Sequence, residues 1–329
     1  MRGVPTVARM NVYVSHISAV RYRHEEYEGC NSRPRKAALT GCCRSARELR
    51  TFKLRPQLFG GAPVHIMVPD ATRRISCEGI CCHVCTQHMP KGSFTDEGGG
   101  LYVASPGLAL LQMAPQLSMP GLLLLAMEFC GTYRLRPADE EACFDCTPLA
   151  TAGELRRYAQ HAKGFAGRDA VLRALRWCVD GAASPMESEL VARLCLPPLL
   201  GGYGCPLPDM NARQKLGEQQ RVLAARSCLF GDLVWPQQGL VVEYNGQVWH
   251  SGRDMLTRDA QRANAVAALG LKMLTVTADI FNDFDAFDAF AHEVMKTLGM
   301  RQRAATPVQV LRRRLLPEEL RQQEKLIVS

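Results

Sequence analysis

The chain has 329 residues, of which 47% are hydrophobic and 22% are charged, and its formal net charge is +8. This composition is typical of a globular protein built as one large domain or two domains. The longest strongly apolar run is far shorter than a membrane span, and the N-terminus lacks the apolar core of a signal peptide. We therefore expect no membrane segment, and the cytoplasm is the expected location.

The positive charge is concentrated at the N-terminus. Residues 1–60 contain twelve Lys and Arg against four Glu, and this excess equals the net charge of the whole chain. A basic segment joined to a neutral body indicates a polyanionic partner such as DNA, and a solvated arm has the same signature. We expect residues 1–56 to form a basic N-terminal segment, with a small DNA-binding headpiece as one form of it. A short helix is predicted within residues 14–22.

Residues 57–181 are predicted to form an α+β middle domain. Apolar and β-branched runs separated by turns indicate strands, and apolar residues at helical spacing indicate helices. The expected strands cover residues 64–68, 80–85 and 101–104, and the expected helices cover residues 106–113, 121–130, 152–161 and 168–179.

The fourteen cysteines raise the question of zinc. Two CxxC pairs, Cys82 with Cys85 and Cys143 with Cys146, could supply four thiolates to one ion. The first pair lies in a strand-like run, and other cysteines stand singly among apolar neighbours, where a free thiol behaves as a small hydrophobic side chain. Buried thiols are the favoured interpretation, and we expect the four cysteines not to converge. A zinc-stapled interaction module is the alternative.

Residues 182–300 are predicted to form a second domain, followed by a basic tail at residues 301–329. Ser184, Pro185 and Glu187 form a capping box that begins a helix running to about Cys195. The expected elements after this helix are a strand at residues 219–225, a hairpin at 231–246, a helix at 253–269, a strand at 271–276 and a helix at 284–298.

The hairpin carries the most informative residues of the chain. Centring its turn on the Pro-Gln-Gln-Gly breaker pairs Trp235 with Leu240, Val234 with Val241, Leu233 with Val242, and Asp232 with Glu243. Like charges directly opposite each other are destabilising, so the two carboxylates need a counter-charge. A hard cation such as Mg²⁺ or Mn²⁺ supplies one, because Mg²⁺ is typically held by one or two carboxylates. Ion pairs with Arg are the alternative.

Two more polar residues belong to the same end of the hairpin. Side chains alternate along a strand, so Asn245 shares a face with Glu243. Gly246 then breaks the strand, and His250 follows four residues later.

The order of elements in the last third of the chain resembles the PD-(D/E)XK core of restriction-endonuclease-like proteins. It resembles most closely the branch near the very-short-patch repair endonucleases. The resemblance is carried by the helix with Glu187, the two carboxylate strands, His250, and the segment at residues 258–262, Arg-Asp-Ala-Gln-Arg. It implies an α/β fold class, α+β overall, in which a mixed sheet is flanked by helices.

The resemblance also implies a role for each residue. Asp232 and Glu243 would hold the divalent metal, with Glu187 as an outer acidic ligand or orienting group. His250 would act as a general base or as the acid for the leaving group. The two phosphate contacts would be Arg258 and Arg262.

The third motif position departs from the family. It usually carries Lys, or Asp in closer relatives, and here it is Asn245, which supplies no charge. The leading hypothesis is a metal-dependent DNA endonuclease of repair or phage defence. The alternative is a catalytically inactive DNA-binding regulator, because residues 57–180 loosely resemble AbiEi-type antitoxin proteins of toxin–antitoxin systems. DNA is the expected partner in both cases, and a homodimer is left open.

Overall fold

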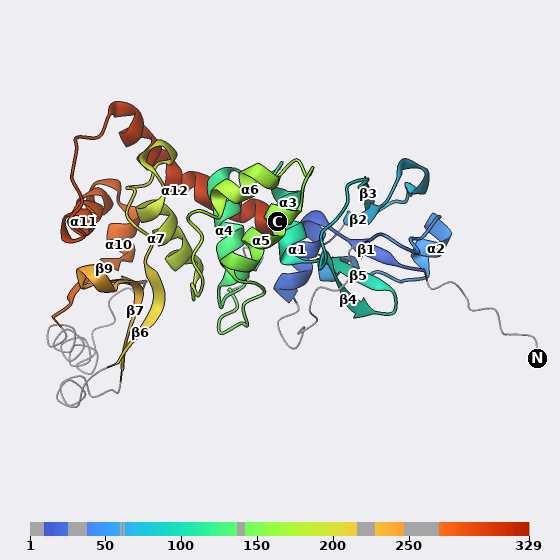
Figure 1. The fold of residues 1–329 in the computed structure, drawn as a ribbon, viewed down its shortest axis with the longest axis horizontal. Helices are drawn as coiled ribbons and strands as arrows, with labels where there is room; N and C mark the ends of the chain where they lie inside the picture. Colours follow the sequence, from blue (N-terminus) through green and yellow to red (C-terminus); the bar gives the residue numbers. More distant parts are fainter. Residues whose placement is uncertain are drawn as a thin grey trace, which may run out of the picture.

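The computed structural model describes residues 10–25, 38–59, 61, 63–136, 142–215, 228–246 and 270–328. Within these ranges the chain has the expected α+β class, with two mixed sheets flanked by helices. The two sheets lie at opposite ends of an elongated molecule, and a layer of helices separates them (Figure 1). None of the helices in the described ranges is long and apolar enough to cross a membrane.

The first unit is built around a five-stranded sheet in the order β3-β2-β1-β5-β4. β1 pairs antiparallel with β2 and parallel with β5, β2 pairs parallel with β3, and β4 pairs antiparallel with β5. Its elements are β1 (Val12–Val14), α1 (His16–Glu25), α2 (Ala46–Arg50), η1 (Pro56–Phe59), β2 (Val64–Val68), η2 (Ala71–Arg73), β3 (Ile80–Val84), β4 (Phe94–Gly98) and β5 (Leu101–Ala104).

β1 lies before the expected domain boundary at residue 56, but it occupies the centre of the first sheet. A strand that begins at residue 12 is hydrogen-bonded on both sides by strands from residues 64–68 and 101–104. Arg23 in α1 is buried and forms an ion pair with Glu97 at 3.4 Å. The first sheet therefore crosses that boundary, and part of the basic segment belongs to a folded core.

The helical layer follows the first sheet. It contains α3 (Pro106–Met113), α4 (Met119–Cys130), α5 (Ala152–His161) and α6 (Arg168–Ala174). α4 is buried from Pro120 to Cys130, which agrees with its sequence, because a helix that is apolar on all sides belongs inside a core. Ser105 and Ser118 accept hydrogen bonds at the starts of α3 and α4, and each is followed by Pro within the first turn.

The second unit contains a four-stranded sheet in the order β6-β7-β8-β9. β6, β7 and β8 form an antiparallel meander, and β8 pairs parallel with β9. Its elements are α7 (Pro185–Cys195), η3 (Pro198–Leu200), β6 (Asp209–Lys215), β7 (Cys228–Trp235), η4 (Pro236–Gln238), β8 (Leu240–Asn245), β9 (Lys272–Thr277), α10 (Ala278–Asn282) and α11 (Phe284–Thr297).

Arg193 ties α7 to the two helices that follow β9. Its guanidinium lies 3.4 Å from the ring centroid of Phe287 and 4.4 Å from that of Phe281, and it donates a 2.6 Å hydrogen bond to the Phe281 carbonyl. Glu189 lies 3.8 Å from it on the same helix. These contacts fix the orientation of α7, and α7 carries Glu187 at its first turn.

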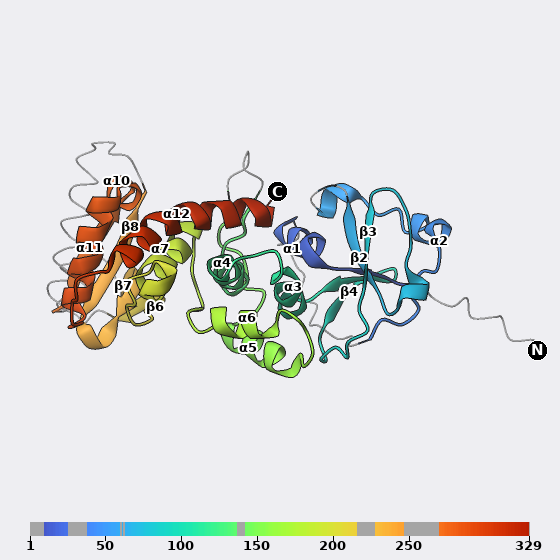
Figure 2. The same cartoon turned by 90° about the horizontal axis from the view of Figure 1, so that it is seen from above.

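The expected basic tail is a helix in its described part. α12 (Pro307–Val328) packs against α4, α7 and η3, and its C-terminal end comes near α1. Figure 2 shows it running along the helical layer from the second unit toward the first. The side chain of Gln323 accepts a 2.7 Å hydrogen bond from the Ser118 amide at the start of α4. α12 therefore connects the two units.

Most element predictions in the described ranges are confirmed. The strands at residues 64–68 and 101–104 and the helices at 106–113 and 152–161 have the expected bounds. The helix at 168–179 is shorter, and the helix expected within 14–22 is split between β1 and α1. The strand at 219–225 and the helix at 253–269 fall outside the described residues. β6 is a strand that the sequence did not indicate.

Candidate functional site

The hairpin of β7 and β8 has three of the four predicted pairs, and its ladder ends before the predicted pair of Asp232 with Glu243. Trp235 pairs with Leu240, Val234 with Val241, and Leu233 with Val242. Alternation along each strand then places Asp232 on the face of Val234, and Glu243 and Asn245 on the face of Val241. The opposite face carries Leu233, Trp235, Leu240 and Val242, which belong to the main hydrophobic core. The polar residues therefore share the face turned away from that core.

Asp232 is half-buried at the open end of the hairpin, and its side chain is hydrogen-bonded to the backbone of the neighbouring strand. Its Oδ2 accepts a 2.7 Å hydrogen bond from the backbone amide of Tyr244. This amide lies between Glu243 and Asn245 in the chain. The bond therefore holds the Asp232 carboxylate beside the strand that carries the other two residues.

The strand that carries Glu243 and Asn245, β8, pairs with β9 along its other edge. Glu243 is paired with Thr275 and Asn245 with Thr277 in the parallel ladder. Glu243 is half-buried, whereas Asn245 is exposed. Burial and exposure therefore change along this face, from a partly enclosed pair of carboxylates to an open amide at the end of the strand.

Glu187 caps α7, as the sequence predicted, and a side chain of β6 also holds it. Its amide donates to Ser184 Oγ at 3.2 Å, and its carboxylate accepts from the Ala183 amide at 2.8 Å. Asn211 Nδ2 donates to the same carboxylate at 2.7 Å and to the Gly181 carbonyl at 2.9 Å. The capping role and proximity to the hairpin therefore coexist in one residue.

Asn211 is a residue of this site that the sequence analysis missed. In the ladder of β6 and β7 it lies between the pairs Met210–Leu233 and Ala212–Gly231, which puts it opposite Asp232. Its backbone has φ +48°, a left-handed conformation that Asn tolerates better than most residues. Asn211 therefore bridges Glu187 to the strand of Asp232. No signal was available in the sequence, because residues 209–215 lack a strand-like apolar pattern.

The electrostatics of Glu187 link it to Asp232. Burial raises the pKa of the Glu187 carboxyl above its usual range, and the negative charge of Asp232 raises it further. The hydrogen bonds from Ala183, Asn211 and Ser184 act in the opposite direction. A carboxylate that is desolvated beside another carboxylate is a place where a cation or a proton is stabilised.

The remaining residues of the predicted site are not all described. His250, Arg258 and Arg262 lie outside the described residues. Within the described ranges, the three carboxylates of Asp232, Glu243 and Glu187 do not form a group whose ligand atoms all lie within 4.8 Å of one another. The hairpin places Asp232 and Glu243 on one face of adjacent strands, and Glu187 is a neighbour held by hydrogen bonds.

Among the described residues, three histidines do lie close enough together to share a metal ion. His16, His65 and His83 each offer a ring nitrogen, and these atoms all lie within 4.8 Å of one another. The three side chains come from the start of α1, from β2 and from β3, and each is partly buried. The sequence analysis missed this cluster, because 18 or more residues separate its members and only the parallel pairing of β2 with β3 brings two of them together.

The CxxC pairs do not form such a group. Cys82 lies in β3, and Cys85 follows directly after the end of that strand. Cys143 and Cys146 lie in a loop, and no group of potential ligands in the described part of the chain includes either pair. Twelve of the cysteines are described as free thiols, several of them buried.

Comparison with known proteins finds relatives in Mycobacterium tuberculosis. The chain is 28% identical over 161 residues to the proteins named Uncharacterized protein MT2308, of strain CDC 1551 / Oshkosh, and Uncharacterized protein Rv2248, of strain H37Rv. The match covers 40% of this chain and 54% of each relative, so the chain spans about half the length of the curated relatives it matches. No protein-family model and no solved structure matches the chain.

Proposed function

We propose that this chain is a metal-dependent, endonuclease-like protein that hydrolyses DNA phosphodiester bonds. The observation that carries the proposal is the hairpin of β7 and β8, in which Asp232 and Glu243 share one face of adjacent strands beside Glu187. The order of elements supports it as well. A helix with an acidic first turn precedes a three-stranded meander, and a fourth strand pairs parallel with the third. This is the order that the PD-(D/E)XK resemblance implies.

The carboxylates fit a hard divalent cation. Mg²⁺ keeps several waters and is usually bound through one or two carboxylates together with substrate phosphates, and the hairpin offers two half-buried carboxylates on one face. Mn²⁺ accepts the same oxygen ligands. When bound, such an ion would polarise the scissile phosphate and lower the pKa of a coordinated water.

The protein side chains have separate tasks in this proposal. Asp232 is held by the Tyr244 amide, so its carboxylate is orientated before any ion binds. Asn211 and the Ala183 amide hold Glu187 in a fixed position near Asp232. Asn245, exposed at the end of β8, can orient a water or a phosphate oxygen through its amide.

One observation favours a second candidate function. Asn245 stands where a charged residue is usual, so the transition state would lack one cationic or anionic side chain. A DNA-binding regulator of the AbiEi antitoxin type would keep the same fold without cleavage. In that case the exposed cations around α2, such as Arg47, Arg50 and Lys53, would serve DNA binding.

The deciding experiment is a cleavage assay with the full-length protein. Duplex, nicked and mismatched DNA would be incubated with Mg²⁺ or Mn²⁺, using wild type, Asp232→Ala and Glu243→Gln. Asp279→Asn is the matched control, because Asp279 is an exposed acid of α10 in the same unit. Metal-dependent cleavage that both site variants lose and the control keeps is the expected result. Tight DNA binding without cleavage of any substrate would support the regulator instead.

A further inference from the structure

We propose that His16, His65 and His83, together with the thiol of Cys81, form a zinc site in the first sheet, separate from the hairpin carboxylates. The three imidazoles come from three elements and their ligand nitrogens lie within 4.8 Å of one another. The His83 Nε2 and His65 Nδ1 atoms are 2.9 Å apart, and the rings of His16 and His83 stack at a centroid distance of 3.7 Å. Zn²⁺ binds His nitrogens and Cys sulfur in a tetrahedral arrangement.

The backbone around the cluster is tied together at several points. The Ser15 amide donates to the His65 carbonyl at 2.9 Å, and the His65 amide donates to Ser18 Oγ at 2.9 Å. β2 is therefore joined to both sides of the start of α1. These bonds hold His16 and His65 in a fixed relation, as a preorganised metal site requires.

His16 is placed at a conformational cost. Its φ of +52° lies in the left-handed region, which residues with a Cβ adopt much less readily than glycine. Its amide donates to Gln112 Oε1 at 2.9 Å, and Gln112 in turn donates to Met67 Sδ at 3.0 Å. The strained backbone is therefore held by a buried side chain of α3, and the result of this arrangement is that the imidazole of His16 meets the other two.

The outer contacts of the cluster also fit a metal site. His16 Nδ1 lies 3.0 Å from Ser15 Oγ. A metal-ligating imidazole usually hydrogen-bonds through its second nitrogen, which fixes the ring and leaves the other nitrogen for the ion. Ser15 is fully buried, so this contact does not compete with bulk water.

Cys81 is placed to be the fourth ligand. It is the register partner of His65 in the parallel ladder of β2 and β3, and its Sγ lies 3.4 Å from His83 Nε2. It is not one of the three groups within 4.8 Å, so its side chain must rotate to complete a tetrahedron. A sulfur ligand would bring a negative charge that three neutral imidazoles lack. This charge would offset the repulsion of an ion by Arg21 near His65 and by Arg74 near His83.

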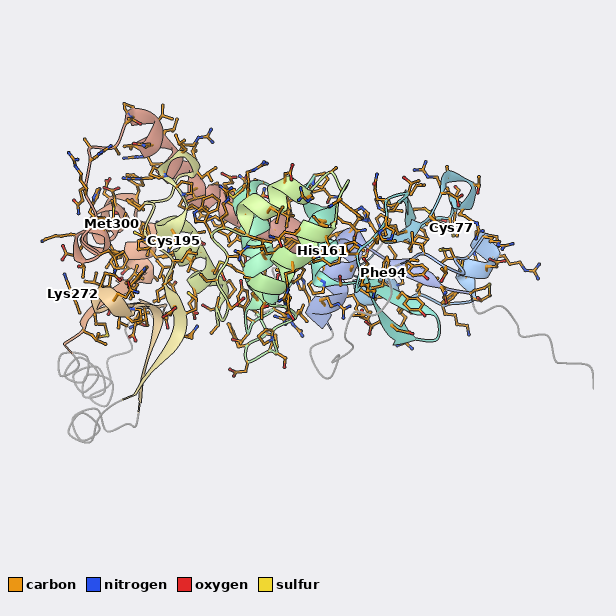
Figure 3. All side chains as sticks on the ribbon, viewed as in Figure 1. Cys77, Phe94, His161, Cys195, Lys272 and Met300 are labelled. Atoms are coloured by element: carbon orange, nitrogen blue, oxygen red, sulfur yellow. The ribbon has the colours of Figure 1, made fainter. Side chains whose placement is uncertain are left out.

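The zinc site would act as a staple at the edge of the sheet. β3 is the edge strand and each of its residues is partly buried. An ion shared by His83 of β3, His65 of β2 and His16 of α1 would join that edge to the next strand and to the covering helix. The hairpin carboxylates lie in the other unit. Figure 3 labels Cys77, in the loop before β3, and Lys272, at the start of β9, toward opposite ends of the molecule.

The test measures metal binding by the full-length protein. Metal-free protein would be titrated with Zn²⁺ against a chromophoric chelator, and with Co²⁺ while the visible and near-ultraviolet spectrum is recorded. One equivalent of Zn²⁺ per chain is expected, and Mg²⁺ should not compete, because it prefers oxygen ligands. Loss of an outer contact typically lowers metal affinity about 10–100-fold. His65→Gln and His83→Gln remove direct ligands and should therefore each lower zinc affinity by more than about 100-fold.

The controls separate ligation from folding. His88→Gln changes an exposed histidine in the loop after β3 and should leave zinc affinity unchanged. Circular dichroism of the metal-free variants shows whether each one folds. Cys81→Ser should abolish a thiolate-to-cobalt charge-transfer band that the wild type displays, and a wild-type Co²⁺ complex without that band would overturn the assignment of Cys81. Stoichiometric zinc that survives in folded His65→Gln and His83→Gln proteins would overturn the site.

Discussion

The two sheets hold their chemistry-bearing residues in contrasting ways. In the second sheet, Asp232 and Glu243 come from one hairpin and lie on adjacent strands, eleven residues apart in the chain. In the first sheet, the histidines come from α1, β2 and β3 and meet only because β1 occupies the centre of the sheet and β2 pairs parallel with β3. A local constellation can be read from sequence, whereas one assembled by long crossovers cannot.

The two regions also differ in the charge that they favour. Around Glu187 and Glu189, burial raises the pKa of each acid, so protons or cations are favoured there. Around His16 and His83, burial lowers the pKa of each imidazole, so the neutral, metal-ligating form is favoured. These directions agree with the two proposals, in which the second unit takes a hard cation on carboxylates and the first takes a softer ion on nitrogen and sulfur.

A crossed pair of variants tests whether the two regions act separately. Asp232→Ala should lower DNA cleavage by about a hundredfold or more, because a metal contributes several kcal/mol to transition-state stabilisation, while zinc affinity stays unchanged. His83→Gln should do the reverse. The measurements are initial cleavage rates with Mg²⁺ and zinc titrations of the same preparations. A variant that impairs both readouts, in protein that is folded by circular dichroism, would mean that the two regions form one functional unit.

The sequence predicted the local structure around the hairpin and the start of α7, and it did not indicate the histidine cluster, for physical reasons. The predicted strand pairs of Trp235, Val234 and Leu233 are confirmed, because a short turn and alternating apolar residues determine the register of a hairpin. The predicted capping by Ser184 and Glu187 is confirmed, because the start of a helix is determined by residues that are close in sequence.

Long-range pairing decides what the sequence did not show. Asn211 is polar and lies in a strand with no apolar alternation, so its position opposite Asp232 follows only from the β6–β7 ladder. His83 lies inside a CxxC motif and shares a face of β3 with Cys81, and the approach of this face to His16 depends on how the sheet packs against α1. The central place of β1 was also missed, because three residues give too short a pattern to distinguish from a loop.

The pH dependence of stability should have opposite signs in the two units. Burial raises the pKa of Glu189 to about 7, although Arg193 and Arg321 lower it, and Glu324 adds to the rise. The unfolded value is about 4.5, so the folded state binds the extra proton between these values. This stabilisation is present below pH 4.5 and is lost as the pH rises through 7, with an upper limit of about 3 kcal/mol. Glu189→Gln should flatten that decline.

The histidine cluster should respond in the other direction in metal-free protein. Burial lowers the pKa of His16 to about 3 and that of His83 to about 4, with neighbouring histidines and Arg74 adding to the effect. The unfolded chain binds protons below about 6.5 and the folded chain does not, so stability falls as the pH falls from 6.5 toward 4. Urea unfolding across pH 4.5 to 8 with a chelator would measure both limbs. If His83→Gln does not reduce the loss of stability below pH 6.5, or if Glu189→Gln does not reduce the loss toward pH 7, this expectation is wrong.

Asn245 offers a test that sharpens the proposed function itself. It is exposed at the end of β8, so a lysine fits there without repacking the core. An ammonium beside Asp232 and Glu243 would stabilise the negative charge that develops on a phosphate in the transition state. Asn245→Lys should therefore raise the Mg²⁺-dependent cleavage rate about tenfold, which corresponds to about 1.4 kcal/mol.

The control for this variant places the same charge elsewhere in the unit. Asn282→Lys adds a lysine at an exposed position near the end of α10 and should leave the rate unchanged. If Asn245→Lys instead tightens DNA binding without any cleavage, the chain is a regulator that has kept only the nuclease-like arrangement.

The smallest expected effect concerns the exposed cations around α2, at the end of the molecule far from the hairpin (Figure 1). Each Lys or Arg that neutralises a phosphate releases counterions and adds about 0.9 to the slope of log affinity against log salt. About four contacts from the basic segment would give a slope near −4 by this rule. Arg47 and Arg50 are exposed on one short helix, so replacing both with Gln should make the slope shallower by about 1.8.

Truncation cannot test that segment, because removing residues before 57 would delete β1 from the centre of the first sheet. Charge replacement in the full chain avoids this, and Arg301→Gln with Arg303→Gln is the matched control, since both are exposed and lie between α11 and α12. The measurement is DNA affinity across a salt series without divalent metal, where the hairpin carboxylates repel phosphate. Equal slopes in wild type and the α2 double variant would show that Arg47 and Arg50 do not contact DNA phosphates. Non-specific affinity would then have to come from other basic residues of the chain.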